Sequence, residues 1–169
     1  RGRIHPVELG TRIVREADLA VFETPVGPGA PNAFAVTLGG DSETAETVAG
    51  AEQELAAVME AAAAERGWRL EGPVTIRIQF GTGPASRADV AASVETGPVG
   101  AWARLMSTDG KSIDIGINRS VIGRSSSADV HLGNDDVSRN HALICREGGA
   151  VWLVDLGSSN GTLLNGEPV

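Results

Sequence analysis

Two polar segments near the C-terminal end carry the side chains whose types and spacing could do chemistry. They are Ser138-Arg139-Asn140-His141 and the stretch from Asp155 to Thr162. Each lies between short apolar runs, so each is expected to form a loop between strands, where binding chemistry is usually placed. Ser138, His141 and Asp155 could form a hydrolytic triad. The serine hydroxyls and arginines could instead converge on a bound anion.

The hydrolase and metal-site interpretations are weaker than the anion-binding one. A hydrolase would need an oxyanion site, and the sequence has no Gly-x-Ser-x-Gly segment. A metal site could be built from His131, His141 and Cys145, but their spacing resembles no zinc pattern. Charged and hydroxyl donors on neighbouring loops are what an anion site requires. We therefore expect these loops to bind an anion, with no catalytic residue and no metal or other cofactor.

Composition limits the partners that the chain can have. The net charge is −8, from 14 basic and 22 acidic residues. An acidic chain without a basic stripe argues against nucleic-acid binding. No run of about 18 apolar residues is present, which argues against direct membrane insertion. Cys145 is the single cysteine, so it cannot form an internal disulfide; this favours the cytoplasm and a buried apolar role.

Residues 1–97 predict an α+β domain of order α-β-α-β-β. The Pro- and Gly-rich stretch 24–32 is expected to be a loop. Ser42, Thr44 and Thr47 are interpreted as capping residues of the second helix rather than as phosphorylation sites. The predicted helices and strands are helices at 4–20 and 42–66 and strands at 33–38, 73–80 and 88–95.

From residue 103 onward the pattern changes to short apolar runs separated by turn signals, after a linker at 98–102. This pattern is typical of an all-β sandwich. Trp102 and Trp152 are expected to pack in the core or against the linker. The predicted strands are 104–106, 112–117, 121–122, 130–132, 142–145, 151–156 and 162–164.

The second half resembles the forkhead-associated (FHA) domain over residues 103–169. The resemblance rests on five segments in the family's order and spacing: Gly123-Arg124, Asp129–Leu132, Val137–Ala142, Asp155–Thr162 and Asn165-Gly166. It implies a β-sandwich that binds phosphothreonine peptides through loops at one end. An FHA sandwich continues with further strands beyond the Asn165-Gly166 turn. We therefore expect a truncated sandwich here, with an exposed sheet edge.

The FHA resemblance also implies roles for individual residues. The residues that would contact the phosphopeptide are Arg124, Ser138, Arg139, Ser159 and Asn160. The residues that would shape the loops are Gly123, His141 and Gly161. The physical chemistry agrees, because a phosphate dianion offers strong acceptor oxygens, arginine supplies a fork of donors, and an asparagine amide can pair with a peptide backbone. Asp129 and Asp155 are expected to brace loops.

The first half resembles the uncharacterised N-terminal domain that precedes FHA domains in actinobacterial proteins. The matching segments are Arg3–Glu8, Pro31–Leu38 and Gly72–Ile76. This family is linked to Ser/Thr-kinase signalling and to control of cell-wall synthesis, including a flippase partner with a pseudokinase domain. The resemblance implies no catalytic residue.

Together these observations predict a phosphothreonine-binding adaptor in bacterial Ser/Thr-kinase signalling. Its expected partners are threonine-phosphorylated proteins, Ser/Thr protein kinases and their substrates. The expected location is the cytoplasm, with recruitment to the membrane through a phosphorylated partner as a further option. Two alternatives stay open: an FHA-fold scaffold that no longer binds phosphate, and a Ser/His hydrolase.

Overall fold

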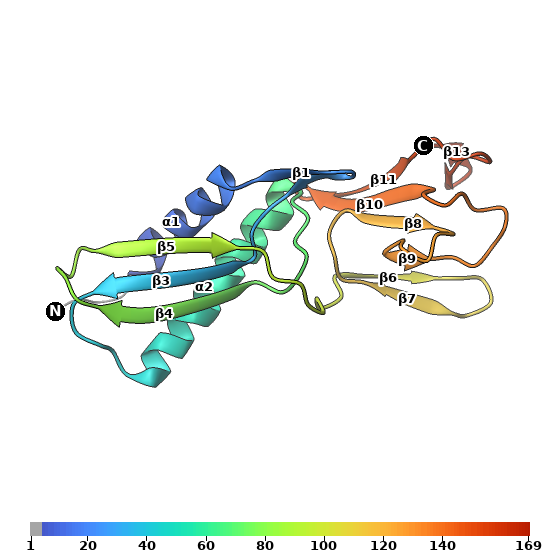
Figure 1. The fold of residues 1–169 in the computed structure, drawn as a ribbon. Coiled ribbons are helices and arrows are strands. Elements are labelled where there is room, and N and C mark those ends of the chain that lie inside the picture. Colours follow the sequence, from blue (N-terminus) through green and yellow to red (C-terminus); the bar gives the residue numbers. More distant parts are fainter. Residues whose placement is uncertain (1–4) are drawn as a thin grey trace. The chain divides into compact units, whose positions relative to one another are not determined.

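The computed structural model describes residues 5–169 (Figure 1). The chain divides into two compact units. The first comprises the chain up to Glu23 together with Gly29–Ala63 and Leu70–Gly97. The second comprises Thr24–Pro28, Ala64–Arg69 and Pro98–Val169. Residue 4, where the first helix was predicted to begin, and the Arg3 end of the N-terminal resemblance lie outside the described residues.

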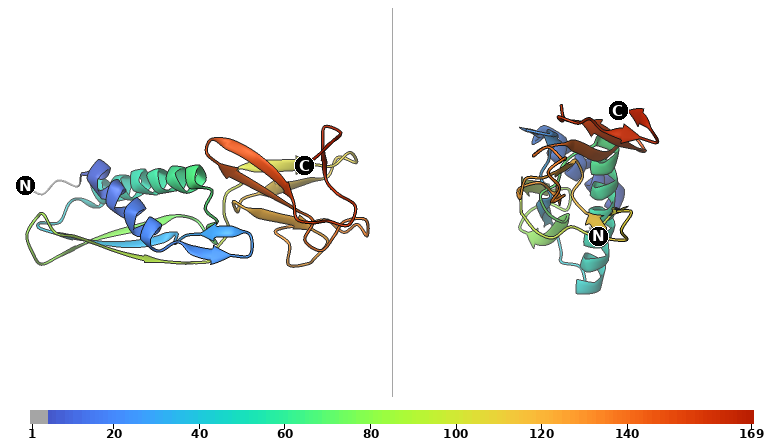
Figure 2. Two further views of the ribbon diagram at one scale, coloured as in Figure 1. Left: turned by 90° about the horizontal axis from the view of Figure 1, so that it is seen from above. Right: turned by 90° about the vertical axis from the view of Figure 1, so that its right-hand side faces the viewer.

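The first unit is a three-stranded sheet covered on one face by two helices (Figure 2). The strand order is β4-β3-β5, with β3 parallel to β4 and antiparallel to β5. The elements are α1 (Pro6–Leu19), β3 (Ala33–Gly39), α2 (Ala45–Arg66), β4 (Thr75–Gly81) and β5 (Ala88–Ser93). This confirms the predicted α-β-α-β-β order.

Local sequence explains how both helices begin. Pro6 occupies the first turn of α1, where its missing N–H leaves no hydrogen bond unmade. Thr44 precedes α2 and accepts a hydrogen bond from the Thr47 N–H at 3.2 Å, which confirms the capping interpretation for Thr44. The core of the unit forms where the helices meet β3 and β4, from Leu9, Ile13, Ala17, Phe34, Val36, Leu55, Met59 and Ile76.

On each edge strand of this sheet, one backbone group forms a hydrogen bond with a helix side chain. On β4, the Ile78 N–H donates to Glu52 Oε1 at 2.8 Å. On β5, Arg12 Nη1 donates to the Ala88 carbonyl oxygen at 3.0 Å. Unpaired backbone groups on an edge strand can pair with another strand, so each of these bonds removes one group that such a strand could use.

The prediction of a loop at 24–32 is wrong in part. Two short strands, β1 (Phe22–Thr24) and β2 (Gly27–Gly29), form a hairpin there. The Thr24 hydroxyl holds the turn, because it donates to the Gly27 carbonyl at 2.6 Å and accepts from the Val26 N–H at 3.2 Å. Gly27 has φ of +107°, a conformation that favours glycine. The turn residues themselves obscured the strands in the sequence.

The second unit is a β-sandwich built on a four-stranded sheet of order β11-β10-β8-β9 and the hairpin β6-β7. The core between them is formed by Ile115, Ile122, Val130, Ala142 and Ile144. The strands are β6 (Ala103–Met106), β7 (Ser112–Ile115), β8 (Ser120–Gly123), β9 (Val130–His131), β10 (Ala142–Glu147), β11 (Ala150–Asp155), β12 (Leu163–Leu164) and β13 (Glu167–Pro168). The predicted sandwich is therefore confirmed.

Strand β11 forms an edge of the four-stranded sheet and leaves apolar side chains exposed. Leu153 packs against the core, so Trp152 and Val154 on either side of it point to the opposite face. Trp152 is 55% exposed, so it does not lie in the core, which was one of the two places predicted for it. Trp102 does pack against the core, with the Arg146 guanidinium 4.6 Å from its ring centre. Cys145 is buried as predicted, and burial raises the pKa of its thiol.

Candidate functional site

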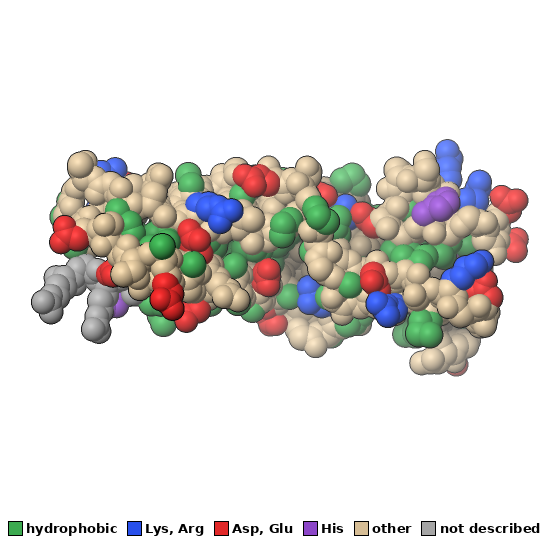
Figure 3. Space-filling view, turned by 90° about the horizontal axis from the view of Figure 1, so that it is seen from below, with side chains coloured by type: hydrophobic (Ala, Val, Ile, Leu, Met, Phe, Trp, Pro, Cys, Tyr) green, Lys and Arg blue, Asp and Glu red, His purple; other side chains and the backbone are tan. Residues whose placement is uncertain are grey.

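Three loops at one end of the second unit enclose a cleft of about 650 Å³. They follow β8, precede β10 and follow β11. Figure 3 shows basic side chains beside a histidine toward this end of the second unit, with acidic side chains also present there. The lining side chains are all polar and include two arginines and no carboxylate: Arg124, Ser125, Ser127, Ser138, Arg139, Asn140 and Ser159. Such a lining suits a ligand with negative charge and several acceptor oxygens.

Hydrogen bonds hold Arg124 at its backbone N–H and at Nε, the inner nitrogen of its guanidinium. Its N–H donates to the Ser138 carbonyl at 2.9 Å, and its Nε donates to the Val137 carbonyl at 3.1 Å. Within residues 5–169, its two terminal nitrogens have no hydrogen-bond partner. The side chain is therefore oriented by the protein while its outer donors remain available to a ligand.

Gly123 allows the first two loops to approach each other closely. A Cβ placed on Gly123 would overlap the Arg139 carbonyl oxygen. The same close approach lets the Ser125 N–H donate to that carbonyl at 3.2 Å. Glycine at this position thus brings Arg124 and Arg139 to the same cleft.

Ser138 belongs to the second loop and contacts the third. Its backbone N–H donates to His141 Nδ1 at 3.0 Å, and its Oγ accepts from the Ser159 N–H at 3.0 Å. Because Oγ acts as an acceptor in that bond, its own hydrogen is available for donation to a ligand.

His141 links two of the loops through its two ring nitrogens. Nδ1 accepts from the Ser138 N–H, so in the neutral ring Nε2 carries the hydrogen and donates to the Gly161 carbonyl at 3.0 Å. Neither nitrogen contacts the Ser138 hydroxyl, and the Asp155 carboxylate bonds elsewhere. Ser138, His141 and Asp155 therefore do not form the hydrogen-bonded relay that a hydrolytic triad requires.

Asp155 organises the third loop from within, as the sequence predicted. Its carboxylate accepts from the Ser158 N–H at 2.9 Å, from Ser158 Oγ at 2.6 Å and from Thr162 Oγ1 at 2.7 Å. These bonds, led by that from the Ser158 hydroxyl, lower the pKa of Asp155 to about 2. Gly161, at φ of +78°, donates its N–H to Ser158 Oγ at 2.9 Å. The loop is thus preformed without ligand.

Four of the five residues predicted to bind ligand line this cleft: Arg124, Ser138, Arg139 and Ser159. Within the described part of the chain, the Arg139 guanidinium has no hydrogen-bond or ion-pair partner. Asn160 is not among the lining residues. Its Nδ2 donates to the Asp136 carbonyl at 2.8 Å, which leaves its Oδ1 and one N–H for a ligand.

Sequence reasoning missed three lining residues, Ser125, Ser127 and Asn140. The two serines directly follow Gly123-Arg124, and a run of hydroxyl donors beside an arginine was an available signal. Residues 5–169 contain no group of three or more His, Cys, Asp or Glu side chains placed to hold a metal ion. No helix among these residues is long and apolar enough to span a membrane.

Comparison with protein families matches both halves of the chain. Residues 120–169 match the FHA domain, and residues 1–82 match the N-terminal domain of FhaA. The chain is therefore similar to an FhaA N-terminal domain in its first half and to an FHA domain in its C-terminal part.

Two curated relatives come from actinobacteria and match within the FHA part. The glycogen accumulation regulator GarA of Mycolicibacterium smegmatis is 49% identical over 47 residues, which are 28% of this chain and 30% of the relative. The oxoglutarate dehydrogenase inhibitor of Corynebacterium diphtheriae is 46% identical over 46 residues, 27% of this chain and 32% of the relative. The chain thus spans about a third of the length of these relatives.

Two solved FHA structures are similar at 35% identity. One comes from a structural and functional analysis of phosphothreonine-dependent FHA domain interactions; the match covers 37% of this chain and 65% of that one, with a TM-score of 0.34. The other is the FhaA FHA domain complexed with the intracellular domain of Rv3910; the match covers 39% of this chain and 72% of that one, with a TM-score of 0.35.

Proposed function

We propose that this chain, built from an FhaA-type N-terminal domain and an FHA domain, is a phosphothreonine-dependent adaptor without enzymatic activity. The observation that carries the proposal is the polar cleft, in which the outer nitrogens of Arg124 and the guanidinium of Arg139 have no partner within residues 5–169. Charges held without a partner are suited to a ligand of opposite charge.

A phosphorylated side chain fits these donors better than a carboxylate does. A phosphate monoester carries about −1.5 to −2 charge at pH 7 and has three strong acceptor oxygens. Arg124 and the Ser138 hydroxyl would contact the phosphate, with Arg139 and Ser159 adding further donors. Asn160 would use its remaining amide groups on the peptide backbone beside the phosphothreonine. Gly123, His141 and Gly161 would hold the loops in place.

An adaptor role agrees with the absence of a relay between Ser138 and His141, because both His141 nitrogens bond to backbone groups. It also agrees with the names of the relatives, which describe a regulator and an inhibitor. Because the proposed ligand is a phosphothreonine side chain, the partners would be threonine-phosphorylated proteins, including Ser/Thr kinases and their substrates. We place the protein in the cytoplasm, where a phosphorylated membrane partner could recruit it and where it would act in control of cell-wall synthesis.

The test is a titration of the full chain with matched peptides from a phosphothreonine peptide library. Each selected sequence is measured with phosphothreonine, phosphoserine and unmodified threonine. We expect the phosphothreonine form to bind at least 100-fold more tightly than the unmodified form, since two or more charge-assisted hydrogen bonds of about 1.5–3 kcal/mol each are at stake. Equal affinities for all three forms would favour the scaffold alternative.

The hydrolase alternative is tested separately. General esterase and phosphatase substrates are incubated with the full chain and with the Ser138→Ala variant. Turnover by the wild type that disappears in the variant would contradict the adaptor proposal.

A further inference from the structure

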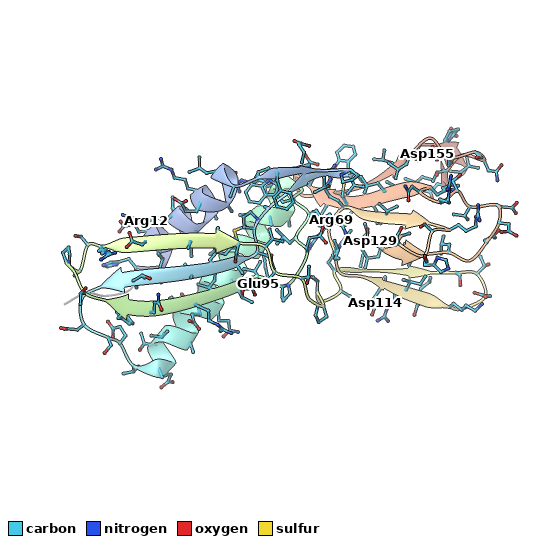
Figure 4. The ribbon with its side chains drawn as sticks, viewed as in Figure 1. Arg12, Arg69, Glu95, Asp114, Asp129 and Asp155 are labelled. Atoms are coloured by element: carbon cyan, nitrogen blue, oxygen red, sulfur yellow. The ribbon has the colours of Figure 1, made fainter. Side chains whose placement is uncertain are left out.

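Arg69 lies far from the FHA motifs in the sequence but belongs to the same compact unit as the cleft. Its guanidinium forms a two-point pair with Asp129, with Nη1 to Oδ2 and Nη2 to Oδ1 both at 2.9 Å. Nη1 also donates to the Arg119 carbonyl at 3.0 Å. Figure 4 shows Arg69 and Asp129 side by side. Their side chains are only 13% and 18% exposed, so water competes weakly for these bonds.

Asp129 connects Arg69 to the start of β8. Besides the arginine, its Oδ2 accepts from the Val121 backbone N–H at 2.8 Å. Burial by itself would raise the pKa of Asp129, but the hydrogen bonds from Arg69 and Val121 and the charge of Arg69 lower it overall. The carboxylate is therefore held ionised between an arginine on one side and a strand on the other.

The loop that carries cleft residues ends at Asp129. Strands β8 and β9 run parallel, with Ile122 opposite Val130, and residues 124–129 join them. Within this loop the Ser127 N–H donates to Ser125 Oγ at 3.2 Å, and the Ala128 N–H donates to the Ser125 carbonyl at 3.1 Å. These bonds hold Ser125, Ser127 and Ala128 together within the loop.

Each end of this loop has its own anchor. The first end is held inside the cleft, where the Arg124 N–H donates to the Ser138 carbonyl at 2.9 Å. The second end is held by the Asp129 contacts with Arg69 and Val121. Ser125 and Ser127, between the two anchors, line the cleft. A shift at the Asp129 anchor would therefore change where these hydroxyl groups stand.

We propose that Arg69 is a positioning residue for phosphate binding, acting through Asp129 on the loop 124–129. The inference rests on the proposed function and extends it to a residue outside both the FHA match at 120–169 and the sandwich predicted at 103–169. Arg69 touches no ligand. It determines where the Ser125 and Ser127 hydroxyls stand, and displacing such ligand-binding donors by about 1 Å can reduce binding strongly.

The test compares two variants of the full chain, Arg69→Gln and Arg104→Gln. Arg104 is a control for the loss of an Arg–Asp pair elsewhere, because it pairs with Asp114 in the same unit but on the β6-β7 hairpin, with a side chain 61% exposed against 13% for Arg69. Phosphothreonine-peptide affinity and amide NMR spectra of the unliganded chains are measured at a temperature where every variant is folded. We expect Arg69→Gln to weaken binding about tenfold, which corresponds to about 1.4 kcal/mol, and to shift the amide signals of Ser125 and Ser127. We expect Arg104→Gln to change neither.

A third variant, Arg69→Lys, keeps the charge but loses the two-point geometry, and we expect an intermediate loss of affinity. It also takes the place of Arg69→Gln if that variant does not fold. Unchanged affinity in the Arg69 variants would overturn the inference, and so would reduced affinity with unchanged Ser125 and Ser127 signals. If the wild type bound no phosphopeptide, the proposed function would fail, while the amide shifts would still decide whether Arg69 positions the loop.

Discussion

Replacing Arg124 with alanine should abolish most phosphopeptide binding while leaving the fold intact. The substitution removes the two outer guanidinium nitrogens, which have no protein partner within residues 5–169 and line the cleft. It also removes the hydrogen bond from Nε to the Val137 carbonyl. The ligand contact and the protein contact are separate, so their loss can be measured separately.

The two losses differ in size. If each outer nitrogen donates one charge-assisted hydrogen bond worth about 1.5–3 kcal/mol, the variant loses about 3–6 kcal/mol of binding free energy. At 1.4 kcal/mol per factor of ten, the dissociation constant rises by roughly 10²- to 10⁴-fold. The bond to the Val137 carbonyl is exposed, so water competes for both partners, and its loss should lower the free energy of unfolding by about 1 kcal/mol or less.

Calorimetric titration of a phosphothreonine peptide measures the first loss, and urea unfolding measures the second. Arg77→Ala is a suitable control, because Arg77 is an 80% exposed arginine on β4 of the first unit. It should leave both quantities unchanged. A loss of affinity below about fivefold in Arg124→Ala would refute the assignment of its outer nitrogens to the phosphate.

Three further substitutions test how the loops are held. Gly123→Ala places a methyl group against the Arg139 carbonyl and should lower the free energy of unfolding by about 1–3 kcal/mol in urea denaturation. His141→Ala breaks one hydrogen bond within the loop before β10 and one to the loop after β11, so it should reduce peptide affinity about tenfold and stability by about 2 kcal/mol; unchanged values would contradict its bridging role. The pKa of Asp155 is lowered from 3.8 to about 2, so its stabilising contribution is complete above about pH 4 and is lost as pH falls toward 2. A carbon NMR titration of its carboxyl should show a midpoint near 2, and Asp155→Asn should remove that part of the acid-induced loss of stability.

The sequence predicted those parts of the molecule that are determined by residues close together in the chain. The strands around Arg124 and Ser138 are bounded by turn residues. Helix α1 shows an amphipathic period and has a proline in its first turn, and α2 begins after the capping residue Thr44. The hydroxyl groups on loop 124–129 could also have been predicted, because Ser125 and Ser127 directly follow the motif arginine, Arg124.

Other features depend on contacts that no local pattern contains. Arg69 and Asp129 are 60 positions apart, and nothing near either residue in the sequence predicts the pair. Trp152 lies in an apolar run, which does not reveal which members face the core. The hairpin at β1 and β2 was hidden because its glycines and prolines, which are typical of loops, also form tight turns between strands.

The side-chain contacts on both edges of the first unit's sheet restrict how that unit can associate with other chains. An extended segment that added to β4 would have to displace Glu52 from the Ile78 N–H, and one that added to β5 would have to displace Arg12 from the Ala88 carbonyl. Strand addition is a common route both to peptide capture and to fibrillar aggregation. The bond on each edge therefore makes strand addition to the first unit less favourable, and favours a partner that recognises side chains on a sheet or helix face over one that extends the backbone ladder.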